Sequence, residues 1–277
     1  MSLRKKIGIL FQPKIQAAGN LASELEKVVK DLGASAWVCS SWEEDKATEH
    51  VDGTDLIICL GGDGTMLRAA RIANPSSVPI LGVNLGRIGF MTELSPEEVL
   101  EQVPALIEGA GWVEERAMLF AELVSADTSP LYALNDVVVA RGERCRLIRV
   151  KTSVDGEFVT TYKCDGVIIA TATGSTGYSL AAGGPVLHPQ AREILMNPIA
   201  AHLSLNTAMV LPSDSVIEME INTTHDARLS LDGQIEMPLI DGSVIRVKRS
   251  PYDTRLVRMQ RPALFYQTLM QRLEKRE

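Results

Sequence analysis

The chain has 277 residues, of which 45% are hydrophobic and 23% charged, and its formal net charge is −7 at pH 7. This length can bury a substantial core, and we expect two domains. The negative charge argues against broad binding to nucleic acid or to a membrane surface, and no run of about 18 apolar residues could cross a bilayer. The four cysteines lie far apart without CxxC spacing, so no disulfide framework or zinc site is predicted and a cytoplasmic location is expected.

The first hundred-odd residues alternate strand and helix patterns. The predicted strands cover residues 7–11, 55–60 and 79–83, and the predicted helices cover 21–32 and 66–73. Alternating strands and helices predict a parallel sheet, whose ligands bind at the carboxyl ends of the strands. The glycine clusters of this region lie at those ends.

A further helix is predicted to begin at Ser95 and to run to about Glu108, because Ser95-Pro96-Glu97-Glu98 has the pattern of a capping box. Beyond Trp112 the pattern changes to short β-like runs separated by turn signals such as Asp232-Gly233. These runs cover residues 119–124, 134–140, 147–154, 158–162, 167–172, 216–221, 228–231 and 244–248.

The last helix is predicted to begin at Pro262, with Phe265, Leu269 and Leu273 on one apolar face. We expect this face to pack on the N-terminal domain. The fold class is therefore a two-domain α+β protein: an α/β domain with a parallel sheet, and a β-rich C-terminal domain. The expected boundaries are 1–115 with a returning segment 255–277 for the first domain, and 116–254 for the second.

The segment Gly61-Gly62-Asp63-Gly64-Thr65 joins a predicted strand to a predicted helix. Its glycines would let backbone N–H groups approach phosphate oxygens at the positive end of the helix. Asp63 could then accept a proton from an attacking hydroxyl or help to hold a metal ion. The alternative is a tight turn in which Asp63 caps the helix. This is not a Walker loop, because no Gly-Lys-Ser/Thr follows the glycines.

A second glycine-rich loop, Thr171 to Tyr178, follows another predicted strand and is rich in hydroxyl groups. Its backbone and side-chain donors suit an adenine and a ribose phosphate. Loops of this composition are nevertheless more often simple turns. Asn135-Asp136 alone would likewise more often be a strand-edge pair or a turn.

The Gly61–Thr65 string resembles the signature shared by NAD kinases, diacylglycerol and sphingosine kinases and, more loosely, 6-phosphofructokinases. Further stretches resemble NAD kinases in particular and extend the resemblance over nearly the whole chain. They are Asn84-Leu85-Gly86-Arg87-Ile88-Gly89-Phe90, Leu134-Asn135-Asp136-Val137, Asp165-Gly166, Thr171 to Ser179, Gly183-Gly184-Pro185 and Ser230-Leu231-Asp232-Gly233-Gln234.

The resemblance implies roles for individual residues. Asp63 would be catalytic, beside a nucleotide loop of Gly61, Gly62, Gly64 and Thr65. The NAD-binding residues would be Asn135, Asp136, Asp165, Thr173, Thr176, Gly177, Tyr178 and Gln234. Within this set, Asp136 would bind a ribose hydroxyl and Asp165 would reach toward the nicotinamide side. Asn84 and Gly86 would shape the floor beside the phosphate loop, and we expect Phe90 to pack in the core.

The chain also departs from the family pattern. Asp136 stands where glutamate is usual, Ala172 replaces a usual proline and Gly177 a usual alanine. The segment Leu205–Ala208 lacks an arginine that is often present. We expect Ala172 and Gly177 to make the 171–178 loop more flexible. The missing arginine would remove one inferred charged contact.

The activity implied by the resemblance is phosphorylation of the 2′-hydroxyl of the adenosine ribose of NAD, with ATP or polyphosphate as donor and Mg²⁺ or Mn²⁺ as cofactor. NAD and ATP would be the substrates, neither nucleic acid nor membrane is an expected partner, and a homodimer or homotetramer is implied. No metal site built from protein side chains is predicted. We expect the active site between the two domains. The alternatives are a lipid kinase, which would share only the phosphate loop, and a non-catalytic dinucleotide sensor.

Overall fold

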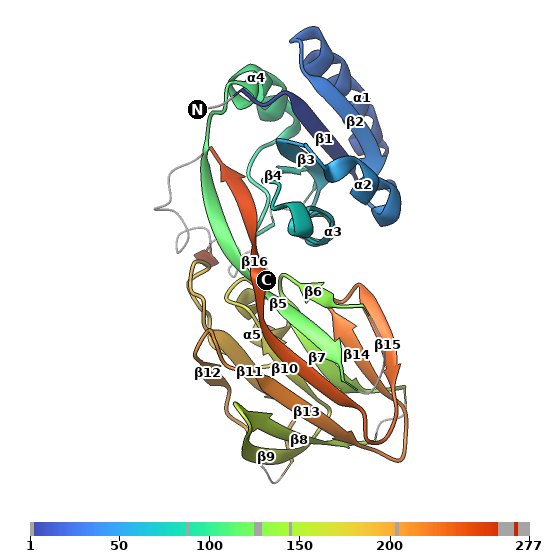
Figure 1. The fold of residues 1–277 in the computed structure, drawn as a ribbon, viewed down its shortest axis with the longest axis vertical. Coiled ribbons are helices and arrows are strands. Elements are labelled where there is room, and N and C mark those ends of the chain that lie inside the picture. Colours follow the sequence, from blue (N-terminus) through green and yellow to red (C-terminus); the bar gives the residue numbers. More distant parts are fainter. Residues whose placement is uncertain are drawn as a thin grey trace. The chain divides into compact units, whose positions relative to one another are not determined.

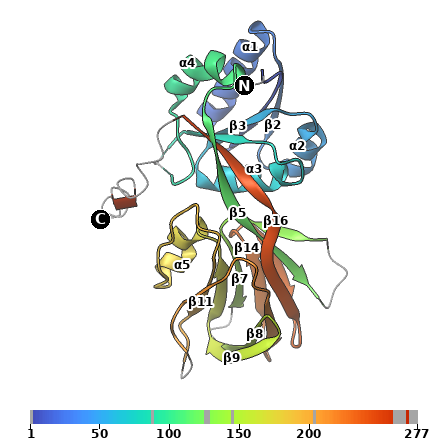
Figure 2. The same ribbon diagram turned by 60° about the vertical axis from the view of Figure 1, so that its left-hand side comes forward.

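The computed structural model describes residues 3–86, 89–124, 129–143, 146–202, 205–259 and 269–270. The chain divides into two compact units, one comprising Met1–Glu115 with Thr254–Glu277 and the other Arg116–Asp253. Figures 1 and 2 show the elements of both units. The start of the predicted last helix at Pro262, together with Phe265 and Leu273, lies outside the described residues.

The first unit is an α/β unit whose strands and helices alternate, as the sequence predicts, although the strand at 35–40 and the helix at 44–51 were not predicted. Its elements are β1 (Lys6–Phe11), α1 (Gln16–Asp31), β2 (Ser35–Ser40), α2 (Glu44–Val51), β3 (Leu56–Gly61), α3 (Asp63–Ala73), the 3-10 turn η1 (Asn74–Ser76), β4 (Ile80–Asn84) and α4 (Pro96–Ile107). The strands pair in parallel in the order β2-β1-β3-β4. All of β3 is buried, as expected for a strand covered on both faces of a parallel sheet.

One hydrophobic cluster of the first unit joins its sheet to α1 and α4. Alternate residues of β3, Leu56, Ile58 and Leu60, share this cluster with Leu25 of α1 and Val103 of α4. Alternate residues of a strand point to the same face, so α1 and α4 cover one face of the sheet.

The predicted start of α4 is confirmed. The Ser95 hydroxyl accepts the N–H of Glu98 at 3.2 Å, and the Glu98 carboxylate accepts the N–H of Ser95 at 2.7 Å. Two backbone donors at the helix start are thereby satisfied reciprocally.

The second unit is β-rich. Its strands are β6 (Leu131–Ala133), β7 (Asp136–Arg141), β8 (Ile148–Val154), β9 (Glu157–Cys164), β10 (Gly166–Ala170), β11 (Ile194–Ile199), β12 (Met209–Leu211), β13 (Ile217–Asn222), β14 (Ala227–Leu231) and β15 (Ile235–Leu239), with the 3-10 turn η2 (Gly174–Thr176) and the short helix α5 (Tyr178–Ala181). One sheet has the order β12-β11-β10-β7-β14-β15, and β13, β8 and β9 belong to the other. Apolar residues of both sheets form one core between them, as in a sandwich.

Two long strands, β5 (Trp112–Leu123) and β16 (Val244–Arg258), belong in part to each unit. They pair with each other and run side by side (Figures 1 and 2). The sequence predicted only short runs at 119–124 and 244–248, and it did not predict β11, β12 or β15. Within the first unit, the end of β16 pairs in parallel with β4, Leu256 opposite Ile80.

Candidate active site

The glycine-rich loop Gly61–Thr65 joins β3 to α3. Gly61 is the last residue of β3, and Gly62 is the N-cap of α3 with extended backbone angles. A Cβ atom on Gly61 would lie 2.3 Å from the Thr65 hydroxyl oxygen, so only glycine fits there. No side chain hydrogen-bonds at the N-cap. The start of α3 therefore offers the glycine-rich helix N-terminus that binds phosphate groups in α/β proteins.

Asp63 is the first residue of α3, and its carboxylate binds the loop that follows β4. The N–H groups of Phe90 and Met91 donate to its two oxygens at 2.8 and 3.0 Å. A Cβ atom on Gly89 would lie 2.2 Å from Asp63 Oδ1, so the close approach of this loop requires glycine. The alternative that Asp63 caps its own helix is wrong: the carboxylate instead fastens the 89–91 segment beside the glycine-rich loop.

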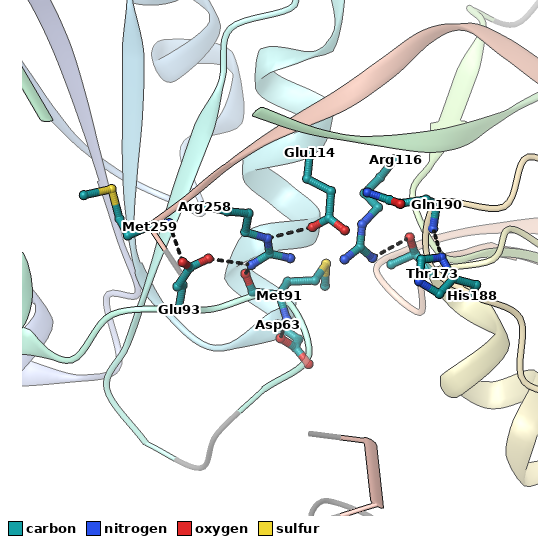
Figure 3. Close-up of polar contacts among 10 residues, drawn as sticks. All are labelled: Asp63, Met91, Glu93, Glu114, Arg116, Thr173, His188, Gln190, Arg258 and Met259. Atoms are coloured by element: carbon teal, nitrogen blue, oxygen red, sulfur yellow. Dashed lines mark hydrogen bonds and ion pairs between the residues drawn. The ribbon is translucent and has the colours of Figure 1, made fainter. Parts of the chain in front are cut away.

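A buried ion network holds the same segment from its other side (Figure 3). The guanidinium group of Arg258, at the end of β16, donates to the Glu114 carboxylate at 2.7 Å, to the Glu93 carboxylate at 3.3 Å and to the Met91 carbonyl oxygen at 2.9 Å. These three side chains are 7–11% exposed. Met91 is bound by Arg258 through its carbonyl oxygen and by Asp63 through its N–H, so the network and the Asp63 carboxylate hold the same segment.

Asn84 closes a tight turn at the end of β4. Its amide donates to the Gly86 carbonyl oxygen at 3.1 Å and accepts the Gly86 N–H at 3.2 Å. Asn84 pairs with Gly61 in the sheet, so the turn lies next to the glycine-rich loop. Arg87 and Ile88 lie outside the described residues. Phe90 was expected in the core but is only partly buried, and its backbone N–H donates to Asp63.

In the second unit, the loop after β10 is bound to the segment that precedes β7. The Thr171 hydroxyl donates to the Leu134 carbonyl oxygen at 2.6 Å, and the Thr171 N–H donates to the Asn135 carbonyl oxygen at 2.9 Å. A Cβ atom on Gly174 would lie 2.0 Å from the same Asn135 oxygen, so the approach requires glycine. Two sequence stretches that were singled out separately, 134–137 and 171–179, thus form one structure.

Asp232 is the residue that fixes the segment before β7. Its carboxylate accepts the N–H groups of Leu134, Asn135 and Asp136 at 3.0, 2.8 and 3.1 Å. Asp232 and Gly233 have φ angles of 53° and 62° and form the hairpin turn between β14 and β15. The sequence predicted this turn but not the contact, which joins residues almost a hundred positions apart.

Asp136 is buried next to this carboxylate. Burial, and after it the negative charge of Asp232, together raise the pKa of Asp136 to about 7. A Cβ atom on Gly177 would lie 3.9 Å from both the Asp136 carboxylate and the Asn135 side-chain amide, so Gly177 lies over this pair. At neutral pH Asp136 can therefore donate a hydrogen bond as well as accept one.

Three further residues that were predicted to bind NAD, Thr173, Thr176 and Tyr178, differ in burial. Thr173 and Thr176 are buried, and the Thr176 hydroxyl donates to the Thr173 carbonyl oxygen at 3.2 Å. The Thr173 hydroxyl accepts a 3.3 Å hydrogen bond from Arg116, a buried residue that the sequence analysis did not single out (Figure 3). Tyr178 is 48% exposed at the start of α5, so its ring is open to a ligand.

Gln234 follows the Asp232-Gly233 turn and lies at the same end of the sheet as Asn135. Asp165 does not lie with this group. It precedes β10, whereas the glycine-rich loop follows β10, and a five-residue strand separates them by roughly 17 Å. Its carboxylate forms an ion pair with Arg141 at 2.6 Å.

In the part of the chain that the structure describes, no three His, Cys, Asp or Glu side chains gather as ligands for a metal ion. Over the same residues, no helix has the length and apolar character needed to cross a membrane.

Comparison with known proteins identifies both halves of the chain. Residues 3–110 match the ATP-NAD kinase N-terminal domain, and residues 134–259 match the ATP-NAD kinase C-terminal domain. NAD kinase of Dehalococcoides mccartyi strain CBDB1 is 44% identical over 273 residues, which cover 98% of this chain and 96% of the relative. NAD kinase of Chloroflexus aurantiacus strain J-10-fl is 39% identical, with 98% and 99% covered.

Solved structures have the same fold. Yeast NADH kinase complexed with NADH matches with a TM-score of 0.83 and 25% identity, over 99% of this chain and 89% of that one. NAD kinase from Archaeoglobus fulgidus in complex with ATP matches with a TM-score of 0.76 and 26% identity, over 97% and 98%. The fold and the glycine-rich loop with its carboxylate are those of a phosphotransferase. The chain belongs to the NAD kinase family, as its sequence motifs predicted.

Proposed function

We propose that this protein transfers the γ-phosphoryl group of ATP to the 2′-hydroxyl of the adenosine ribose of NAD, giving NADP and ADP. The observation that carries the proposal is the Asp63 carboxylate, held at the glycine-rich start of α3 in a chain that aligns with NAD kinases over 98% of its length. Phosphoryl transfer depends mainly on positioning and charge stabilisation, and such a loop supplies both.

The first unit is proposed to bind the phosphate donor. Gly61, Gly62, Gly64 and Thr65 would present backbone N–H groups to the triphosphate at the positive end of α3. The absence of a Cβ at Gly62, where nothing lies within 4 Å, leaves room for phosphate oxygens to approach the backbone.

The second unit is proposed to bind NAD. Asn135, Asp136, Thr173, Thr176, Gly177 and Tyr178 would frame its adenosine half, with Gln234 at the same end and Asp165 toward the nicotinamide. The exposed Tyr178 ring offers an aromatic surface to the adenine, and Asp136 offers a buried polar partner to a ribose hydroxyl. The domain roles follow: 1–115 with 255–277 for the donor and 116–254 for the acceptor.

In the proposed reaction, the 2′-oxygen attacks the γ-phosphorus, the bond to the ADP oxygen breaks, and Asp63 accepts the hydroxyl proton. Each Asp63 oxygen accepts one backbone N–H and keeps a further lone pair for this purpose. A divalent cation, Mg²⁺ or Mn²⁺, would neutralise charge on the phosphates. The donor set fits a cation carried chiefly by the nucleotide, with Asp63 as the carboxylate nearest to it, because Mg²⁺ is commonly held by substrate phosphates and one or two carboxylates.

The test is NADP formation by the purified protein with NAD, ATP and Mg²⁺, measured with an NADP-specific dehydrogenase. Matched reactions replace ATP with polyphosphate, replace NAD with diacylglycerol, or contain EDTA. We expect NADP from NAD and MgATP, none with EDTA, and no phospholipid. Phospholipid without NADP would assign the chain to lipid phosphorylation, and NAD binding with neither product would make it a sensor. We also propose a homodimer or homotetramer, which light scattering of the same preparation tests.

A further inference from the structure

Trp42 is exposed on an ordered turn of the first unit. It follows β2, and 48% of its surface is accessible. Its N–H donates to the Ser40 hydroxyl at 3.2 Å, and the Glu43 N–H donates to the Ser40 carbonyl oxygen at 3.0 Å, so the turn has a defined backbone. The Lys14 ammonium nitrogen lies over the Trp42 ring, 4.7 Å from its centroid. An indole ring and a cation are therefore held together in solvent.

Lys14 follows β1 and Trp42 follows β2, so both lie at the carboxyl ends of the parallel strands. The glycine-rich loop follows β3 at the same end of the sheet. Phe11 of β1 pairs with Ser40 of β2 on one side and with Leu60 of β3 on the other. Beyond the strands, the Ser41 N–H still reaches Phe11 and the Gln12 N–H still reaches Leu60, at 2.9 and 3.0 Å. β1 lies between β2 and β3, so the turn with Trp42 is about two strand spacings, roughly 10 Å, from the phosphate loop. A ribose and a triphosphate can span that distance.

The turn is also tied to α3, the helix of the phosphate loop. Glu44, the first residue of α2, binds Arg68 and Arg71 of α3 at 2.8 Å each. The Arg71 side chain is 9% exposed and the Glu44 side chain 31% exposed. This ion pair is therefore shielded from solvent more than an ordinary surface ion pair. The place of Trp42 relative to the start of α3 is thereby fixed on two sides, by β1 and by α3.

We propose that Trp42 and Lys14 form the subsite for the donor nucleotide, in which the base stacks on the Trp42 ring and Lys14 turns to the triphosphate oxygens. The inference rests on the proposed function. A surface cation–π contact is weak, whereas a hydrogen bond from an ammonium group to a phosphate is charge-assisted, so Lys14 gains by moving. Because every base has a π face, the subsite should discriminate little between ATP and GTP.

The test uses the whole chain and measures binding by calorimetry, with the Mg²⁺ complexes of a non-hydrolysable ATP analogue and of inorganic triphosphate, and with NAD. Trp42→Ala should weaken binding of the analogue about tenfold or more but leave inorganic triphosphate unchanged, since triphosphate has no base to stack. Trp42→Phe keeps a ring and should retain most of the affinity. Lys14→Ala should weaken both donors, and NAD binding should stay unchanged in every variant.

Leu32→Ala is the matched control. Leu32 is an exposed apolar residue of the same unit, but it lies at the end of α1 just before β2, at the opposite edge of the sheet. It should leave all affinities unchanged. Circular dichroism of each variant confirms folding.

Wild-type affinity of Trp42→Ala for the ATP analogue would overturn the proposal, as would an equal loss of analogue and triphosphate, which would indicate damage to the phosphate loop. The two proposals fail separately. If the wild-type chain binds the analogue through Trp42 but makes no NADP, the subsite stands and the proposed reaction is wrong.

Discussion

Replacing Asp63 with asparagine separates the structural role of its carboxylate, which binds the 89–91 segment, from its proposed catalytic role. Asparagine has nearly the same shape, and its oxygen can still accept one of the two backbone N–H groups of Phe90 and Met91. Its NH₂ group would face the other N–H, so one amide loses its acceptor. Leaving such a partly buried donor unsatisfied costs about 1–3 kcal/mol of folding free energy. A stability of about 5–15 kcal/mol would still leave nearly all molecules folded at 25 °C.

The expected loss of activity is far larger than this loss of stability can explain. If Asp63 accepts the hydroxyl proton, Asp63→Asn should lower kcat by about 10²–10⁴-fold while NAD binding survives. The assay is NADP formation at saturating NAD and MgATP, beside urea unfolding and calorimetric NAD binding of the same preparation. Near-normal kcat in a variant that is 1–3 kcal/mol less stable would refute the catalytic role and leave Asp63 as the anchor of the 89–91 segment.

Five further substitutions have defined outcomes. Asp136→Asn should gain stability relative to wild type as pH rises from about 4 to about 7 in paired urea titrations. The pKa of Asp136 is about 7 when folded and 3.8 ordinarily, so over that window the folded wild type still holds a proton that the unfolded chain has lost, and wild-type stability falls as pH rises. A constant difference would contradict this. Arg258→Met removes the cation that binds the buried Glu93 and Glu114 and should lower the free energy of unfolding by about 3–5 kcal/mol; a loss below 1 kcal/mol in chemical denaturation would show that the network is weak. Tyr178→Ala and Asn135→Ala should each weaken NAD binding by about 1–3 kcal/mol, and unchanged calorimetric affinity in both folded variants would move the site elsewhere. Gly174→Ala forces a Cβ to within 2.0 Å of a backbone oxygen and should lower thermal stability by about 1–3 kcal/mol together with NAD affinity, whereas wild-type values for both would contradict the proposed constraint.

The features that the sequence predicted well have local causes. The capping box at Ser95 depends on two residues three positions apart, and the structure has both of its hydrogen bonds. The Gly61–Thr65 loop was predicted from a strand pattern on one side and a helix pattern on the other, and β3 and α3 meet there. Signals of this kind depend only on residues that are close together in the sequence, so a single sequence is enough to detect them.

The residues that sequence reasoning missed act over long separations. Asp232 reads as a turn residue beside Gly233, and nothing near it indicates that its carboxylate binds the backbone of 134–136. Arg258 and Glu114 are 144 positions apart. Arg258 follows the buried apolar residues Leu256 and Val257, which is a signal that a partner exists but does not identify it.

Strand lengths were underestimated for a related reason. The predicted strand covered only residues 244–248. Pro251 lies just beyond it and cannot donate a backbone hydrogen bond to a sheet, yet β16 continues through it to Arg258. Tertiary pairing of its two ends, with β13 and with β4, overrides the local signal.

The end of β16 belongs to the first unit but comes late in the sequence, and this affects when the first unit can complete its contacts during synthesis. The first unit begins at the N-terminus, but Thr254–Arg258 emerge only after the whole second unit has been made. Until then the edge of β4 lacks its partner at Ile80, and Glu93 and Glu114 lack the arginine that neutralises them. N-terminal domains commonly fold first during synthesis. Here the first unit gains Leu256 opposite Ile80, and Arg258 beside Glu93 and Glu114, only after the second unit has been synthesised.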